Sequence, residues 1–116
     1  MSFERACSLS ELRPGEALGV TIDDQDVAIA QEGDEVFVVA DTCSHSYVPL
    51  SEGDVEGCTV ECWLHGSRFD LRTGKPTGLP ATEPVATFPV EVRANPDGTS
   101  DVYVDITTTL NGVTPQ

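Results

Sequence analysis

The stretch Cys43-Ser44-His45 is followed, after sixteen residues, by Cys62-Trp63-Leu64-His65-Gly66-Ser67. The chain has only two histidines, and both lie in this pattern together with two of its four cysteines. Two thiolates and two imidazoles at the spacing C-x-H and C-x-x-H are a typical set of metal ligands. The sequence therefore predicts one metal site, held by Cys43, His45, Cys62 and His65.

The order of these ligands separates two kinds of metal centre. In one class of [2Fe–2S] centre, two cysteines hold one iron and two histidines hold the other, so each loop gives one ligand to each iron. A structural zinc site is the alternative, but such sites usually begin with C-x(2–4)-C and close with H-x(3–5)-H. The one-residue gap between Cys43 and His45 is awkward for closing around a single ion. The pattern therefore favours a two-iron cluster over zinc.

Both loops resemble the cluster loops of a Rieske ferredoxin, the second one from Cys62 through Gly66-Ser67-Arg68-Phe69-Asp70. Asp70-Leu71-Arg72-Thr73-Gly74-Lys75 and Gly78-Leu79-Pro80-Ala81 are similar to the hairpin and the proline loop that follow in that family. The resemblance covers about residues 3–106 and is strongest to the small ferredoxins that feed electrons to ring-hydroxylating dioxygenases. It implies an all-β, antiparallel Rieske fold, in which a β-sandwich-like base carries a small cluster-binding subdomain.

The resemblance also implies a shell of residues around the cluster. High-potential Rieske proteins carry an extra cysteine in each loop, where this chain has Val48 and Leu64, and a tyrosine donor where it has Phe69. Ser67 remains as a donor to a bridging sulfide, and Pro80 belongs to a loop that covers one face of the cluster. With one donor fewer, we expect a midpoint potential toward the low end of the Rieske range of roughly −150 to +300 mV.

Length and composition limit the number of domains and the kinds of targeting segment in this chain. Its 116 residues suit one small domain, which we place over 1–106, with the cluster-carrying excursion over about 42–83 and a polar, frayed tail over 107–116. The first residues lack the apolar segment of a secretory signal, and no stretch approaches the roughly 20 apolar residues of a membrane helix. We therefore expect a cytoplasmic protein that does not bind a membrane.

Two cysteines, Cys7 and Cys58, lie outside the motif. We interpret them as reduced thiols that pack as small hydrophobic groups in a cytoplasmic protein. A disulfide between them is the alternative.

The formal net charge of −14 restricts the partners of this chain. An acidic surface repels nucleic acid and anionic membranes, so neither is expected as a partner. The same charge confers solubility and steers the chain toward a basic patch on a redox partner.

Alternation of apolar and polar residues predicts strands at both ends of the chain. We expect strands over 18–22, 27–30, 36–39, 88–92 and 102–106, with the strand over 36–39 buried on both faces. Asp23-Asp24-Gln25-Asp26 and Asn95-Pro96-Asp97-Gly98 are predicted turns, and Pro89 indicates an edge strand or a bulge. Ser8 is placed to cap a single helical turn before Pro14.

The ligand pattern favours electron transfer over catalysis, because four ligands saturate two irons and leave no open metal position. We expect a monomeric one-electron carrier between a flavin-dependent reductase and a Rieske non-haem iron oxygenase, and not an enzyme in its own right. The length leaves no room for the catalytic domain of an oxygenase α subunit. A ferredoxin serving iron–sulfur cluster assembly or its regulation is the first alternative, and a zinc-binding interaction module is the second.

Docking to such a partner would use residues beside the ligands. Tyr47, Trp63 and Leu64 lie within or next to the two loops. They either pack the loops against each other or form an apolar rim that contacts the partner.

Overall fold

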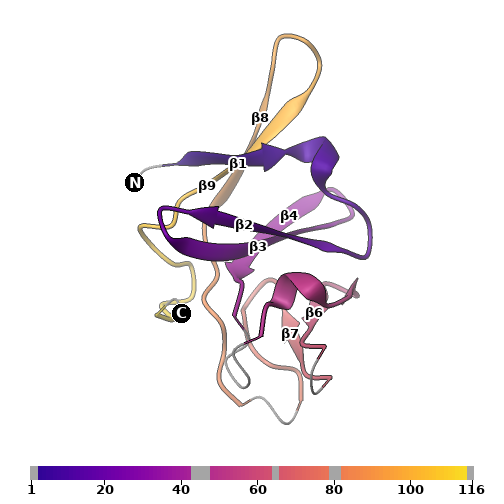
Figure 1. Cartoon of the computed structure of the whole chain (residues 1–116), viewed down its shortest axis with the longest axis vertical. Helices are drawn as coiled ribbons and strands as arrows, with labels where there is room; N and C mark the ends of the chain where they lie inside the picture. The colour runs from indigo at the N-terminus through magenta and orange to yellow at the C-terminus, as the bar shows by residue number, and fades with distance from the viewer. Residues whose placement is uncertain (1–2, 43–47, 64–65, 79–81, 115–116) are drawn as a thin grey trace.

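The computed structural model describes residues 3–42, 48–63, 66–78 and 82–114. Its strands form three antiparallel sheets, β1–β9–β8, β2–β3–β4 and β5–β6–β7, which follow one another along the long axis of the molecule (Figure 1). This confirms the all-β antiparallel fold that the sequence predicts. The elements are β1 Glu4–Ser8, η1 Leu9–Glu11, β2 Ala17–Ile22, β3 Gln25–Glu32, β4 Glu35–Ala40, η2 Leu50–Glu52, β5 Val55–Glu56, β6 Thr59–Glu61, β7 Arg68–Asp70, β8 Val90–Ala94 and β9 Ser100–Val104.

The middle sheet, β2–β3–β4, is buried on both faces. Because side chains alternate across a strand, Val38 and Val39 of β4 enter two different hydrophobic cores. Val36 and Phe37 pack against the same two cores from their margins. The prediction of an apolar strand with two buried faces is therefore confirmed.

The two cores join the three sheets to one another. The body core lies between the middle sheet and β1–β9–β8, and its buried members are Cys7, Leu12, Ile22, Val27, Ile29, Val38, Ala40, Ala86, Phe88, Val102 and Val104. The tip core lies between the middle sheet and β5–β6–β7, and its buried members are Ala28, Ala30, Val39, Leu50, Val55, Cys58, Val60, Cys62, Phe69, Leu71 and Val85. Strands β5, β6 and β7 are two or three residues long, so few hydrogen bonds join them. This sheet is held in place mainly by its buried apolar side chains, each of which stabilises the fold by about 1.5–3 kcal/mol.

Two hairpins show where sequence reasoning placed strand ends correctly and where it did not. Asn95 and Gly98 close the predicted turn, with the Asn95 N–H donating to the Thr99 oxygen at 2.8 Å. The other turn is shorter than predicted, because β3 already begins at Gln25. Asp23 and Asp24 alone form it, both at positive φ, as in a two-residue hairpin whose twist matches that of its strands.

The strands near the C-terminal end are shifted by two residues from their predicted positions. β8 begins at Val90, next to Pro89, and is an edge strand of its sheet, as the proline indicates. Val92 is 43% exposed, because an edge strand has only part of one face covered. The segment before it joins the middle sheet instead, with the Ala40 N–H donating to the Ala86 oxygen at 2.9 Å.

The expectation of a frayed tail over 107–116 is wrong for the described part of that segment. The Asn111 side chain donates to the main-chain oxygens of Thr73 at 2.9 Å and Val85 at 2.8 Å. Its own oxygen accepts from the Thr87 N–H at 3.2 Å. The Asn111 amide therefore joins its own segment to those that hold Thr73 and Val85. The polar composition of residues 107–116 does not reveal this role. The division into a domain over 1–106 and a tail remains a prediction.

We expect Asn111→Ala to lower the free energy of unfolding by about 2 kcal/mol, because part-buried main-chain groups lose their partners. Leu110→Ala is the matched control, since the Leu110 side chain is 66% exposed and its N–H keeps its bond to Thr87. Urea unfolding of both variants measures the difference. Equal stability of Asn111→Ala and Leu110→Ala would show that the amide is not a structural tie.

Candidate metal centre

The described residues frame both predicted ligand loops. Cys62 is the one predicted ligand among them; Cys43, His45 and His65 lie outside the described residues, as do Tyr47, Leu64 and Pro80. The first loop leaves the end of β4 and returns at η2, and the second connects β6 to β7. Both loops thus start and finish on elements that pack around the tip core.

The base of the first loop is closed by one carboxylate. Asp41, one residue after β4, accepts from the Ser51 N–H at 2.6 Å and from the Ser51 hydroxyl at 2.7 Å. Burial raises the pKa of the Asp41 carboxyl, while the two bonds from Ser51 lower it. The two ends of the loop are therefore held together by charge-assisted hydrogen bonds, which are stronger than neutral ones.

The second loop is closed by its own main chain. The Cys62 N–H donates to the Ser67 oxygen at 2.6 Å, and the Gly66 N–H donates to the Cys62 oxygen at 2.9 Å. Gly66 has φ of 75°, a conformation that glycine adopts without steric cost. The side chains of Cys62 and Ser67 are 0% and 2% exposed. A thiol in this position has a fixed backbone and little access to water.

Apolar side chains lie behind these loops. Phe69 is fully buried in the tip core together with Leu50 and Val60. Phe69 is therefore a core aromatic residue, whereas its effect on a bound cluster remains a prediction. Trp63, directly after the buried Cys62, is 48% exposed. The chain thus passes from a buried predicted ligand to an exposed indole within one residue.

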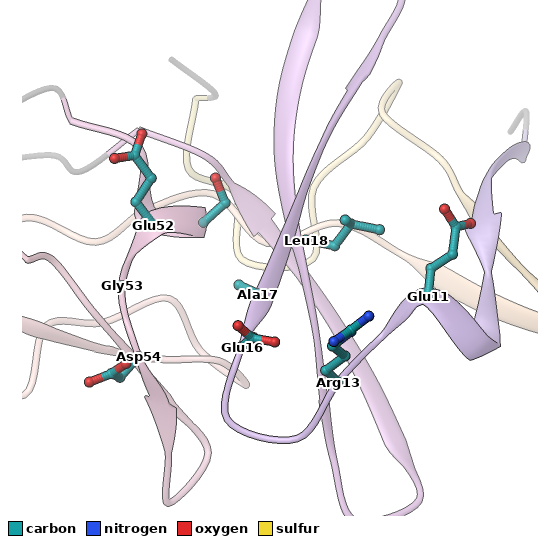
Figure 2. A pocket seen from close by; sticks show the side chains of 9 residues that line it. Glu11, Arg13, Glu16, Ala17, Leu18, Glu52, Gly53 and Asp54 are labelled. Atoms are coloured by element: carbon teal, nitrogen blue, oxygen red, sulfur yellow. The ribbon is translucent and has the colours of Figure 1, made fainter.

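The charge around this end of the molecule is negative. Between the start of β2 and η2 lies an open cleft of about 310 Å³, lined by Glu11, Arg13, Glu16, Ala17, Leu18, Ser51, Glu52, Gly53 and Asp54. Figure 2 shows its carboxylates on both sides, from the N-terminal segment and from the segment after the first loop. Such a surface favours approach by a positively charged partner.

Cys7 and Cys58 are free, buried thiols, so the disulfide alternative is wrong. They lie in different cores, Cys7 in the body core and Cys58 in the tip core. Burial raises the pKa of Cys7 to about 11 and also raises that of Cys58. Both thiols therefore stay protonated at neutral pH and act as packed apolar groups.

The donor set fits a two-iron, two-sulfide cluster. Two thiolates and two imidazoles are the ligands that such a centre takes, and the described thiol, Cys62, is buried in a loop whose backbone is fixed. Elsewhere in the described ranges, no group of three or more histidine, cysteine, aspartate or glutamate side chains is arranged to hold a metal ion.

Sequence reasoning missed several residues that frame the loops, among them Asp41, Ser51 and Gly53. Their residue types are common in turns, and only the structure shows that they meet residues distant in the sequence. The described residues also include no helix that is long and apolar enough to cross a membrane.

Comparison with known proteins assigns the family. The model of the Rieske [2Fe-2S] domain matches residues 2–89. The biphenyl dioxygenase ferredoxin subunit of Pseudomonas sp. (strain KKS102) is 42% identical over 106 residues, which are 90% of this chain and 93% of that protein.

Solved structures agree with this match. The ferredoxin of carbazole 1,9a-dioxygenase from Nocardioides aromaticivorans IC177 aligns with a TM-score of 0.77 and 31% identity, over 90% of this chain and 97% of that one. A structure of the complex of reduced oxygenase and oxidized ferredoxin in carbazole 1,9a-dioxygenase contains a chain that aligns with a TM-score of 0.77 and 35% identity, over 88% of this chain and 100% of that one.

These relatives are electron-transfer components of dioxygenase systems and not catalysts themselves. Their identity favours neither alternative function, the zinc-binding module or the ferredoxin of iron–sulfur cluster assembly. The Rieske-type cofactor, the fold and the role that the ligand pattern predicts agree with that kinship. The chain belongs to the Rieske [2Fe–2S] family, as an electron-transfer ferredoxin of the kind found in ring-hydroxylating dioxygenase systems.

Proposed function

We propose that this ferredoxin takes single electrons from a flavin-dependent reductase and delivers them to the Rieske oxygenase of a ring-hydroxylating dioxygenase. The observation that carries the proposal is its 42% identity to a biphenyl dioxygenase ferredoxin subunit over nearly the whole of both chains. The related ferredoxin in complex with its oxygenase supports the choice of partner. The free thiols of Cys7 and Cys58 fit the reducing conditions of the cytoplasm.

In this proposal Cys43 and Cys62 hold one iron of the cluster, and His45 and His65 hold the other. When bound, the cluster supplies a reversible one-electron centre. The residues of the chain provide its surroundings. The closed main chain of the second loop orients Cys62, and the tip core, with Phe69 and Leu50, excludes water from behind it. Reduced solvent access and fixed hydrogen bonds are the means by which a protein sets a cluster potential.

A single chain is sufficient for this role. Among the described residues the exposed large hydrophobic side chains are Trp63, Val92 and Leu110, which lie far apart in the sequence. Isolated apolar side chains of this kind do not form the extensive patch of a stable dimer. We therefore propose that the ferredoxin acts as a monomer and exposes Trp63 for transient contacts.

We expect the purified chain to contain two irons and two acid-labile sulfides, because the four donors match that cluster. Iron, sulfide and zinc analysis after anaerobic purification measures the content. Cys62→Ser should lose most of the iron, while Cys7→Ser, which changes a buried thiol outside the ligand set, should keep it. One tightly bound zinc and no iron in the wild-type protein would refute the ligand assignment.

The second expectation concerns the midpoint potential. Phe69→Tyr should raise it, because a phenol placed near a ligand sulfur donates a hydrogen bond that stabilises the reduced cluster. Ser67→Ala should lower it, because a buried hydroxyl is lost. Voltammetry of the three proteins in one buffer makes the comparison. If Phe69→Tyr keeps its cluster but its potential is unchanged or lower, the proposed role of position 69 is wrong.

The third expectation concerns docking. Trp63→Ala should slow electron delivery to the oxygenase while leaving the potential nearly unchanged, because it removes an exposed apolar contact next to a ligand. Val92→Ala is the matched control, since Val92 is similarly exposed on β8, in the sheet at the opposite end of the molecule from β6 and β7 (Figure 1). Stopped-flow oxidation of the reduced ferredoxin by the cognate oxygenase gives the rates.

Salt tests the electrostatic part of docking separately from the Trp63 contact. The net charge of −14 should speed encounter with a basic partner, and this attraction is screened over about 10 Å at 0.1 M salt. Association should therefore slow as salt rises, in wild type and in Trp63→Ala alike. Wild-type rates for Trp63→Ala at every salt concentration would place the docking surface elsewhere.

A further inference from the structure

Gly53 is needed because there is no room for a side chain at its position, and not because of its backbone conformation. Gly53 ends η2 with φ of −96° and ψ of 171°, extended values that any residue adopts. Seven other glycines, by contrast, have positive φ. A Cβ on Gly53 would overlap the carbonyl oxygen of Glu61 and lie 2.8 Å from its carbonyl carbon. The main chain at Gly53 is therefore pressed against the main chain at Glu61.

This contact lies between the two ligand loops. Gly53 follows the return of the first loop, and Glu61 is the residue directly before Cys62. A main-chain hydrogen bond supports it, from the Glu61 N–H to the Asp54 oxygen at 2.8 Å. Figure 2 shows Gly53 in the segment that leaves η2 toward Asp54. The end of one loop thus lies against the beginning of the other with no side chain in between.

The same segment is held on its other side by the middle sheet. Ser51, two residues before Gly53, is bonded through its N–H and its hydroxyl to Asp41. A Cβ on Gly19 of β2 would lie 2.8 Å from the Ser51 hydroxyl oxygen and 3.0 Å from Asp41 Oδ2. Two close approaches therefore place η2 between β2 and the end of β6.

We propose that Gly53 is a positioning residue for the cluster, because its lack of a side chain sets the separation of the two ligand loops through the contact with Glu61. In this chain positions 48 and 64 are Val and Leu, so no disulfide links the loops there. The main-chain contact at Gly53 takes the place of a covalent link. This inference concerns the cofactor and does not depend on which oxygenase or reductase the ferredoxin serves.

The test compares Gly53→Ala with Gly33→Ala. Gly33 lies in the β3–β4 turn at φ of 62°, and a Cβ there meets no atom within 4 Å, so this control carries backbone strain without displacing a neighbour. The readouts are iron per chain, the electron paramagnetic resonance spectrum of the reduced cluster, and its midpoint potential. Circular dichroism and thermal unfolding report on the fold itself.

For Gly53→Ala we expect most of the iron to be lost, and the remaining cluster to show a changed spectrum and a shifted potential, while Gly33→Ala matches wild type in all three. A purely structural role for Gly53 predicts fewer clusters with wild-type spectrum and potential, and that result would overturn the proposal. So would wild-type values throughout.

A milder variant decides the matter if Gly53→Ala does not fold. In Gly19→Ala the new methyl group presses on side-chain atoms of Ser51 and Asp41 and not on main chain, so η2 shifts less. A smaller change in the reduced-state spectrum and potential, in a protein that unfolds like Gly33→Ala, supports the proposal. Wild-type spectrum and potential in Gly19→Ala refute the idea that the seating of η2 positions the ligands.

Discussion

Burial of both faces of the β2–β3–β4 sheet is the constraint on which the other parts of this molecule depend. Val38 and Val39, adjacent in β4, enter opposite cores, so a shift of the strand by one residue would exchange the two sets of contacts. The β1–β9–β8 sheet is held by one of these cores and the three short strands of the tip by the other. The ligand loops are thus positioned by a sheet to which they contribute no strand.

Around the loops, the chain uses main-chain contacts and one carboxylate in preference to bulky side chains. Asp41 closes the first loop, and the Cys62 and Gly66 N–H groups close the second. Hydrogen bonds of this kind have defined lengths and directions, whereas apolar packing tolerates small displacements. The cofactor proposed to be held by these two loops would require such definition, because its four predicted ligands must meet in one place.

Much of this organisation was predictable from the sequence. The paired C-x-H and C-x-x-H pattern indicated the cofactor, and period-two alternation predicted the strands of the middle sheet within about two residues. The errors have local causes. Gln25 reads as a turn residue but pairs with Ile22 in the ladder, and Asn111 reads as tail but bonds Thr73, 38 residues away. A single sequence does not show which distant residue a polar side chain will bond.

The sequence by itself determined the class of cofactor, the all-β class and the strongly acidic charge, because these follow from residue identity and local periodicity. Only the tertiary structure decided which residues hold the ligand loops in place. Gly53 has ordinary backbone angles and looks like any turn glycine until Glu61 is brought against it. That approach depends on how the tip packs on the middle sheet, and the stacking of sheets is a property of the whole chain that no short stretch encodes.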